Sequence, residues 1–329
     1  MPLLLSSRAC LVSPLPLYRY DELVIVGAEP RAERWRRLRK GVYVDGAAFE
    51  SLPPWRRYEV RVHAFLLTNP DAILCLESAA VVHGIPLFGE TKDIHVFADG
   101  AKTTTRNGDI CFHTSEDRRE IVQVGAVLAT SVPDTVSDLA RVLPPAKALA
   151  AVDAVISPAQ GGVHGVDELR ERGSFQQNRR GVRVREWVWA HADPRSESPG
   201  ESVSRAVIRW AGFEVPVLQQ EFRYEGMLDR TDFFFPSCGA VGESDGWGKY
   251  DLSDPVAAEE HLRREKLRED RLRRNGHPMA RWTQGAVWKV DPLCVALERA
   301  GVRRVEHPHI PFLATLGRRP RELKRPRTA

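Results

Sequence analysis

The spacing of apolar residues divides the middle of the chain into alternating helices and strands. YEVRVHAFLLTN and ESAAVVHGI have helical spacing, and Gly84 follows the second as a stop signal. DIHVFADG and DICFHTSE alternate apolar and polar positions, which is typical of half-buried strands. SVPDTVSDLARVL, with Pro133 in its first turn, and AKALAAVDAVI are again helical. The pattern predicts a compact α+β unit over residues 56–157.

After residue 197 the pattern predicts a mixed sheet flanked by helices. A helix over 201–212 precedes strands over 215–224, 227–235 and 240–245, and a helix over 255–275 precedes a strand over 279–283. This order is typical of an α/β domain. The interval 158–196 is rich in Gly, Gln, Arg and Ser and is interpreted as a linker region, in which VDELRERG and VREWVWA predict a short helix and a strand.

Residues 1–55 contain a basic stretch, RAERWRRLRKGVYVDG, in which a helix-like segment precedes the β-patterned GVYV. A recognition helix followed by a wing has this pattern, and so does a basic surface helix joined to a hairpin. On the first interpretation, the residues that bind nucleic acid are Arg34, Arg36, Arg37, Arg39 and Lys40.

Composition narrows the class of protein. Hydrophobic residues make up 43% and charged residues 28% of the chain, as in ordinary soluble proteins. No apolar run approaches the roughly 20 residues needed to span a bilayer, and MPLLLSSRAC lacks the pattern of a signal peptide. The five cysteines are far apart and the histidines are scattered. We therefore expect no membrane partner, no zinc site, no disulfide framework and a cytoplasmic location.

The net charge of +4 is unevenly distributed. From Arg318 onward the chain carries six Lys or Arg and one Glu, a balance of +5, so the remainder carries −1. Basicity therefore lies in the C-terminal part, residues 301–329, which is interpreted as a basic tail. Such a tail could bind a polyanion, although a solvated, disordered end is the simpler interpretation.

Acidic residues in the last third are spaced as a metal-dependent phosphodiesterase needs them. Asp232 lies near the end of one predicted strand, and Glu243 and Asp245 lie on the next. Alternation puts Glu243 and Asp245 on one face, where a buried cluster of like charges is costly without a cation. Carboxylates suit Mg²⁺ or Mn²⁺, and such an ion activates the attacking water. The expected cofactor is therefore Mg²⁺ or Mn²⁺.

Three further residues are candidates for the same site. Glu201 lies three residues after Ser198, a spacing that a helix capping box explains and that a metal or water ligand would also fit. Lys249 and Lys266 are candidates for neutralising the phosphate in the transition state. Lys266 is preferred because its predicted helix carries acids on its packing face, although a solvated helix with many ion pairs would have the same pattern.

GESDGWGKY, followed by EKLREDRLRRNGHPMARWT, resembles the PD-(D/E)xK nuclease superfamily, in the branch similar to very-short-patch repair endonucleases. The resemblance covers roughly residues 197–290 and implies a restriction-endonuclease-like domain over 197–300. Asp232 matches the motif aspartate and Glu243 the acid that follows it. Asp245 replaces the lysine expected two residues after Glu243, so the resemblance implies that Lys249 or Lys266 takes its role.

RRLRKGVYV, LESAAVVHGIP and LATSVPDTVSDLAR, in that order, resemble the AbiEi-type antitoxins of type IV toxin–antitoxin systems. The resemblance spans about residues 20–155. It implies a DNA-binding winged helix over 1–55, degenerate or truncated here, and an α+β domain over 56–157. It also implies a cognate toxin as a partner.

Two functions are consistent with these patterns. The first is a Mg²⁺-dependent phosphodiesterase acting on nucleic acid, in the simplest case a DNA endonuclease, whose antitoxin-like front half associates with DNA. The alternative is a DNA-binding regulator or antitoxin-like protein in which the nuclease fold is inactive. Neither the oligomeric state nor the choice between DNA and RNA follows from the sequence.

Overall fold

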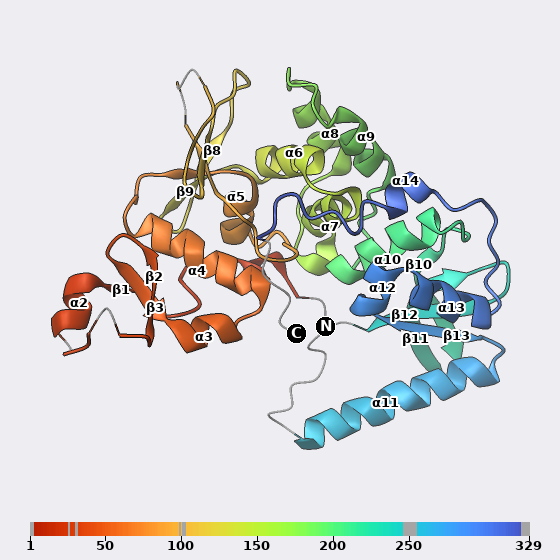
Figure 1. The fold of residues 1–329 in the computed structure, drawn as a ribbon. Helices are drawn as coiled ribbons and strands as arrows, with labels where there is room; N and C mark the ends of the chain where they lie inside the picture. The colour runs from red at the N-terminus through yellow and green to blue at the C-terminus, as the bar shows by residue number, and fades with distance from the viewer. Residues whose placement is uncertain are drawn as a thin grey trace.

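The computed structural model describes residues 3–25, 27–29, 32–98, 100, 103–245 and 255–323, with the side chains of 255–258, 261 and 262 excepted. These residues form a mixed α+β structure with three sheets. A group of helices lies between the six-stranded and the four-stranded sheet (Figure 1). Among the described residues, no helix combines the length and the apolar character needed to cross a membrane.

The N-terminal sheet corrects the expectation of a basic recognition helix. Trp35–Arg39 is strand β2, which pairs antiparallel with β3, Val42–Asp45. Gly41, at φ 75°, allows the tight turn between them. Leu38 on β2 packs against the small core of Val44, Phe49 and Val60, so cross-strand pairing and burial outweigh the helical preference of the arginines. The other elements here are α1 (Leu5–Arg8), β1 (Tyr18–Arg19), α2 (Tyr20–Ile25) and α3 (Gly46–Ser51).

The six-stranded sheet confirms the strands predicted in the middle of the chain. Its order is β6-β7-β5-β4-β9-β8, and it is accompanied by α4 (Pro54–Leu66) and α5 (Leu76–His83). Helix α5 ends at His83, and Gly84 follows it with φ 70°, as predicted for a stop signal. The strands are β4 (Ile73–Leu74), β5 (Ile94–Phe97), β6 (Thr105–Asn107), β7 (Ile110–His113), β8 (Ile121–Val124) and β9 (Val127–Thr130).

The central helices include the segment that was interpreted as a linker. VREWVWA belongs to α9 (Val182–His191) and is helical, so the strand predicted there is wrong. The reason is burial, because Leu169 of α8 (Val166–Ser174) and Val188 and Trp189 of α9 belong to the main hydrophobic core. The remaining central elements are α6 (Val132–Val142), α7 (Pro145–Ile156) and the short turn η1 (Pro158–Gln160).

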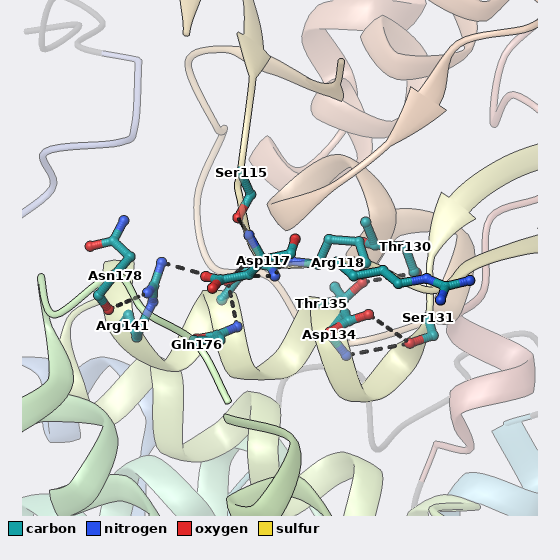
Figure 2. Close-up of polar contacts among 12 residues, drawn as sticks. Ser115, Asp117, Arg118, Thr130, Ser131, Asp134, Thr135, Arg141, Gln176 and Asn178 are labelled. Carbon is teal, nitrogen blue, oxygen red and sulfur yellow. Dashed lines mark hydrogen bonds and ion pairs between the residues drawn. The ribbon is translucent and has the colours of Figure 1, made fainter. Parts of the chain in front are cut away.

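A polar network joins this segment to α6. Arg141 donates to the carbonyl oxygen of Asn178 at 2.8 Å (Figure 2). Gln176 donates to Asp138 at 3.0 Å, and Arg172 pairs with Asp134 at 2.7 Å. Because buried carboxylates need such donors, the network holds the chain between α8 and α9 against α6.

The C-terminal sheet has the order β10-β11-β12-β13, in which β12 and β13 run parallel and the other neighbours antiparallel. Helix α11 covers one face, and α10, α12 and α13 lie on the other (Figure 1). The predicted strands and the two predicted helices are confirmed. Their bounds are α10 (Pro199–Trp210), β10 (Val217–Tyr224), β11 (Met227–Phe235), β12 (Ala240–Asp245), α11 (Pro255–Arg274), β13 (Met279–Thr283), α12 (Gln284–Lys289) and α13 (Asp291–Arg299).

The chain after α13 is not simply a solvated tail. It forms α14 (Ile310–Leu313) and then returns to the six-stranded sheet, where Arg321 makes two hydrogen bonds with the buried Glu77. Leu323 donates its backbone N–H to the carbonyl oxygen of Glu90 at 2.8 Å. A buried carboxylate needs a cationic partner, which explains why this basic stretch is held. Residues 324–329 of the predicted tail lie outside the described residues.

Gly84 provides a test of how α5 and the N-terminal helix pack. A Cβ at Gly84 would lie 1.9 Å from the carbonyl oxygen of Leu5, whereas one at Gly108, which also has positive φ, would meet nothing within 4 Å. We expect Gly84→Ala to lower the free energy of unfolding by about 2–5 kcal/mol, since strain and overpacking add. Gly108→Ala should cost only the strain, about 1–2 kcal/mol. Urea denaturation followed by circular dichroism measures both, and equal losses would show that Leu5 moves aside freely.

Candidate active site in the C-terminal sheet

The strand register brings the two motif acids together. Phe233 of β11 pairs with Gly242 of β12, so one further step in the antiparallel register sets Asp232 beside Glu243 on one face. The backbone N–H of Ser244 donates to Asp232 Oδ2 at 2.9 Å, which anchors the Asp232 carboxylate to β12. Glu243 is only 3% exposed. The predicted convergence of these two carboxylates therefore agrees with the fold.

Two arginines contact the acids of β12. Arg268 of α11 lies with its Nη2 3.1 Å from Glu243 Oε2. Arg281 of β13 pairs with Asp245 at 2.7 Å and also approaches two acids of α11, Glu269 at 3.3 Å and Glu265 at 3.9 Å. Guanidinium groups therefore supply positive charge where a lysine was expected. Such pairing lowers the cost of burying the carboxylates.

Sequence reasoning missed both arginines, although Arg268 left a signal. Arg268 lies three residues after Glu265. It is therefore on the side of α11 whose acidic residues had indicated a packing face. Arg281 lies opposite Glu243 in the parallel pairing of β12 and β13. The second position becomes informative only when that register is known.

The position of Glu201 is compatible with both roles considered for it, the helix capping box and a ligand of metal or water. Its backbone N–H donates to Ser198 Oγ at 3.2 Å, which confirms the helix cap. Its carboxylate accepts from Ser198 Oγ at 2.7 Å, from the backbone N–H of Glu197 at 2.9 Å and from Gln219 Nε2 at 3.0 Å. Burial, and next the negative charge of Asp232, raise the pKa of Glu201 to about 8. The carboxyl group is therefore both a cap and a neighbour of Asp232.

The described residues include only one of the two candidate lysines. Lys266 is exposed on α11, whereas the half-buried acids of that helix face Arg281. Lys249 lies outside the described residues. A catalytic role for either lysine stays a prediction.

Asp232, Glu243 and Asp245 do not form a group of three ligands ready for one ion. Within the described part of the chain, the only three His, Cys, Asp or Glu side chains that could share an ion are His95, Cys111 and His113. Mg²⁺ keeps several waters and needs only one or two carboxylates. A Mg²⁺ or Mn²⁺ site at Asp232 and Glu243 therefore stays a prediction.

Three basic residues of the N-terminal hairpin form ion pairs, although the side chains of Arg34 and Arg36 stay 70% and 44% exposed. Arg34 pairs with Asp45 at 2.9 Å, Arg36 pairs with Glu50, and Arg39 pairs with Asp109. The other two residues, Arg37 and Lys40, are exposed. Because exposed ion pairs are weak, a contact between nucleic acid and this hairpin would involve Arg34 and Arg36 as well as Arg37 and Lys40.

The raised pKa of Glu201 predicts an unusual dependence of stability on pH. Between its pKa of about 4.5 in the unfolded chain and about 8 in the fold, the folded state holds the extra proton, so stability falls as pH rises. The slope approaches about 1.4 kcal/mol per pH unit within that window. Burial lowers the pKa of several histidines, which contribute a slope of opposite sign below about pH 6.5. The contribution of Glu201 is therefore measured as the difference between wild type and Glu201→Gln in urea denaturation at pH 5, 7 and 9, and this difference should grow as pH falls. The exposed Glu221→Gln should show the wild-type pH dependence, and an unchanged pH dependence in Glu201→Gln would contradict the assignment.

The relatives found by comparison with known proteins have names that state no function. No family model matches this chain. Two uncharacterized proteins of Mycobacterium tuberculosis, from strains CDC 1551 / Oshkosh and ATCC 25618 / H37Rv, are each 28% identical over 225 residues, which cover 68% of this chain and 74% of theirs. No solved structure matches it. A function for this chain must therefore be argued from the geometry.

Proposed function

We propose that this protein is a Mg²⁺- or Mn²⁺-dependent phosphodiesterase that acts on nucleic acid, in the simplest case a DNA endonuclease. The observation that carries the proposal is the juxtaposition of Asp232 and Glu243 on neighbouring strands. The succession of helix, three antiparallel strands, helix and parallel strand supports it, since the resemblance to PD-(D/E)xK nucleases implies a restriction-endonuclease-like domain with a mixed sheet.

The residues around the pair suit the chemistry. Asp232 and Glu243 would hold the cation, and Asp245 would assist beside Arg281. Glu201, next to Asp232, would orient the attacking water or the metal.

A cation at Glu243 would compete with Arg268 for the carboxylate. Arg268 then becomes available for a phosphate oxygen, which guanidinium binds well. Lys266 on the same helix could add to this charge.

Cleavage assays with matched variants test the proposal. Asp232→Asn and Glu243→Gln should each lower Mg²⁺-dependent cleavage of plasmid, single-stranded DNA or RNA by at least about 100-fold, the upper range seen when even an outer partner of a metal is lost. Glu221→Gln on the neighbouring strand should cleave as the wild type does. Cleavage that persists in chelator, or in Asp232→Asn, would contradict the site.

A second candidate function is that of a nucleic-acid-binding protein whose nuclease-like domain does not cleave nucleic acid. Arg268 and Arg281 favour it, because each neutralises an acid that a metal would otherwise need, as in a purely structural charge cluster. This candidate predicts binding of DNA without cleavage. It depends on the front half for contact with DNA.

The hairpin can be tested directly for that contact. Removing two phosphate contacts with Arg37→Ala/Lys40→Ala should weaken DNA binding and reduce the salt slope of log K by about 2. Fluorescence anisotropy over a salt series measures both quantities. Arg299→Ala/Arg303→Ala removes the same charge from exposed positions elsewhere. Equal weakening by the two pairs would assign binding to net charge and not to the hairpin.

A further inference from the structure

Two histidines and a cysteine meet on one face of the six-stranded sheet. Strands β5 and β7 pair in parallel, with His95 beside Cys111 and Phe97 beside His113. Side chains two residues apart on a strand share a face, so His113 lies on the same side as Cys111. The three ligand atoms lie within 4.8 Å of one another. The parallel pairing of two strands thus builds a compact group of nitrogen and sulfur ligands.

The two imidazoles face each other through nitrogen atoms. His95 Nδ1 lies 2.8 Å from His113 Nε2. Two ring nitrogens at that distance must share one proton, since one donates and the other accepts. A divalent cation can take the place of that proton, with the nitrogens about 3.3 Å apart in tetrahedral geometry. The two nitrogens must separate by about half an ångström, and the sulfur, which lies within 4.8 Å of them, must come to about 3.5 Å from each.

His95 has a carboxylate near its second nitrogen that could support a metal ligand, beside an arginine that now donates to the same nitrogen. Its second nitrogen, Nε2, lies 3.4 Å from the carboxylate of Glu77. A metal on Nδ1 leaves the ring proton on Nε2, where Glu77 can accept it, and such carboxylate partners orient ligating histidines. Arg321 now donates toward Nε2 at 3.0 Å and also to Glu77 at 2.7 Å. Nε2 is therefore an acceptor in this structure. A metal on Nδ1 requires the ring proton to be on Nε2 and Arg321 to turn from Nε2 to Glu77 alone.

Burial and ligand type indicate which ions fit. His95 is 2% and Cys111 8% exposed, whereas His113 is half-buried and gives the group a side open to solvent. Burial disfavours the charged imidazolium, and metals bind the neutral form. One thiolate and two imidazoles suit Zn²⁺ and related transition metals, whereas Mg²⁺ prefers oxygen.

We propose that His95, Cys111 and His113 bind a divalent transition metal, with Zn²⁺ as the preferred ion. Three protein ligands leave the fourth tetrahedral position to water or a small ligand, the arrangement of zinc sites that are not closed. This site is separate from the carboxylates of the C-terminal sheet and does not depend on the proposed nuclease function.

Metal titration of the untagged, full-length protein tests the proposal. After chelator treatment and dialysis, Co²⁺ should bind with one equivalent, giving a thiolate-to-cobalt charge-transfer band and tetrahedral d–d bands. Zn²⁺ should displace it and raise the melting temperature. Cys111→Ser should abolish the charge-transfer band, and His113→Gln should weaken Zn²⁺ binding by about 100-fold or more in competition with a chromogenic chelator.

Matched variants show whether metal binding depends on these three side chains. Cys238→Ser and His164→Ala change residues of the same types outside the cluster, and Asp232→Ala removes the carboxylate of the candidate active site. All three should keep the charge-transfer band and the Zn²⁺ affinity. Circular dichroism of each variant shows whether it folds, and the half-buried His113→Gln provides a test should Cys111→Ser unfold. Binding of Co²⁺ without a thiolate band, binding unchanged in Cys111→Ser and His113→Gln, or no stoichiometric Zn²⁺ binding would overturn the proposal.

Discussion

The rest of the structure depends on the complete burial of α7. Every residue of this helix is buried, including Lys147 and Asp153. Charged groups in such a place need partners, and they find them in distant parts of the chain. Asp153 pairs with Arg205 of α10 at 2.6 Å and accepts the backbone N–H of Asp193 at 2.9 Å, while Lys147 pairs with Glu322. One helix therefore positions both α10 and the returning C-terminal chain.

Both candidate sites are linked to α7 through these contacts. Helix α10 carries Glu201 in its first turn, and Ser204 one turn later accepts from Trp282 of β13 at 3.0 Å. The start of α10 is thereby set against the sheet that holds Asp232. In the other direction, the chain held by Glu322 places Arg321 on Glu77, which lies behind His95. The packing of α7 thus helps to position Glu201 at the C-terminal sheet. It also helps to position Arg321 and Glu77 beside His95 at the six-stranded sheet.

The two sites differ in the ligands that they offer. At the C-terminal sheet, carboxylate oxygens are balanced by the guanidinium groups of Arg268 and Arg281, so a hard cation would enter in competition with arginine. At the six-stranded sheet, two imidazoles and a thiol lie together, with the nearest carboxylate behind one ring. A hard ion such as Mg²⁺ would therefore prefer the carboxylates of the C-terminal sheet, and a softer ion such as Zn²⁺ would prefer the imidazoles and the thiol.

The sequence by itself determined most elements of the C-terminal sheet and the proximity of Asp232 and Glu243. Alternation defines strands well, and the short turn between β11 and β12 sets their register locally. The basic strand β2 and the helix α9 were mispredicted, since their packing partners outweigh local preference. Only the tertiary structure decided the pairing of Arg281 with Asp245, the contact of Arg321 with Glu77 and the meeting of His95 with Cys111. These contacts depend on parallel strand pairing and on residues up to 244 positions apart, and neither leaves a periodic pattern in the chain.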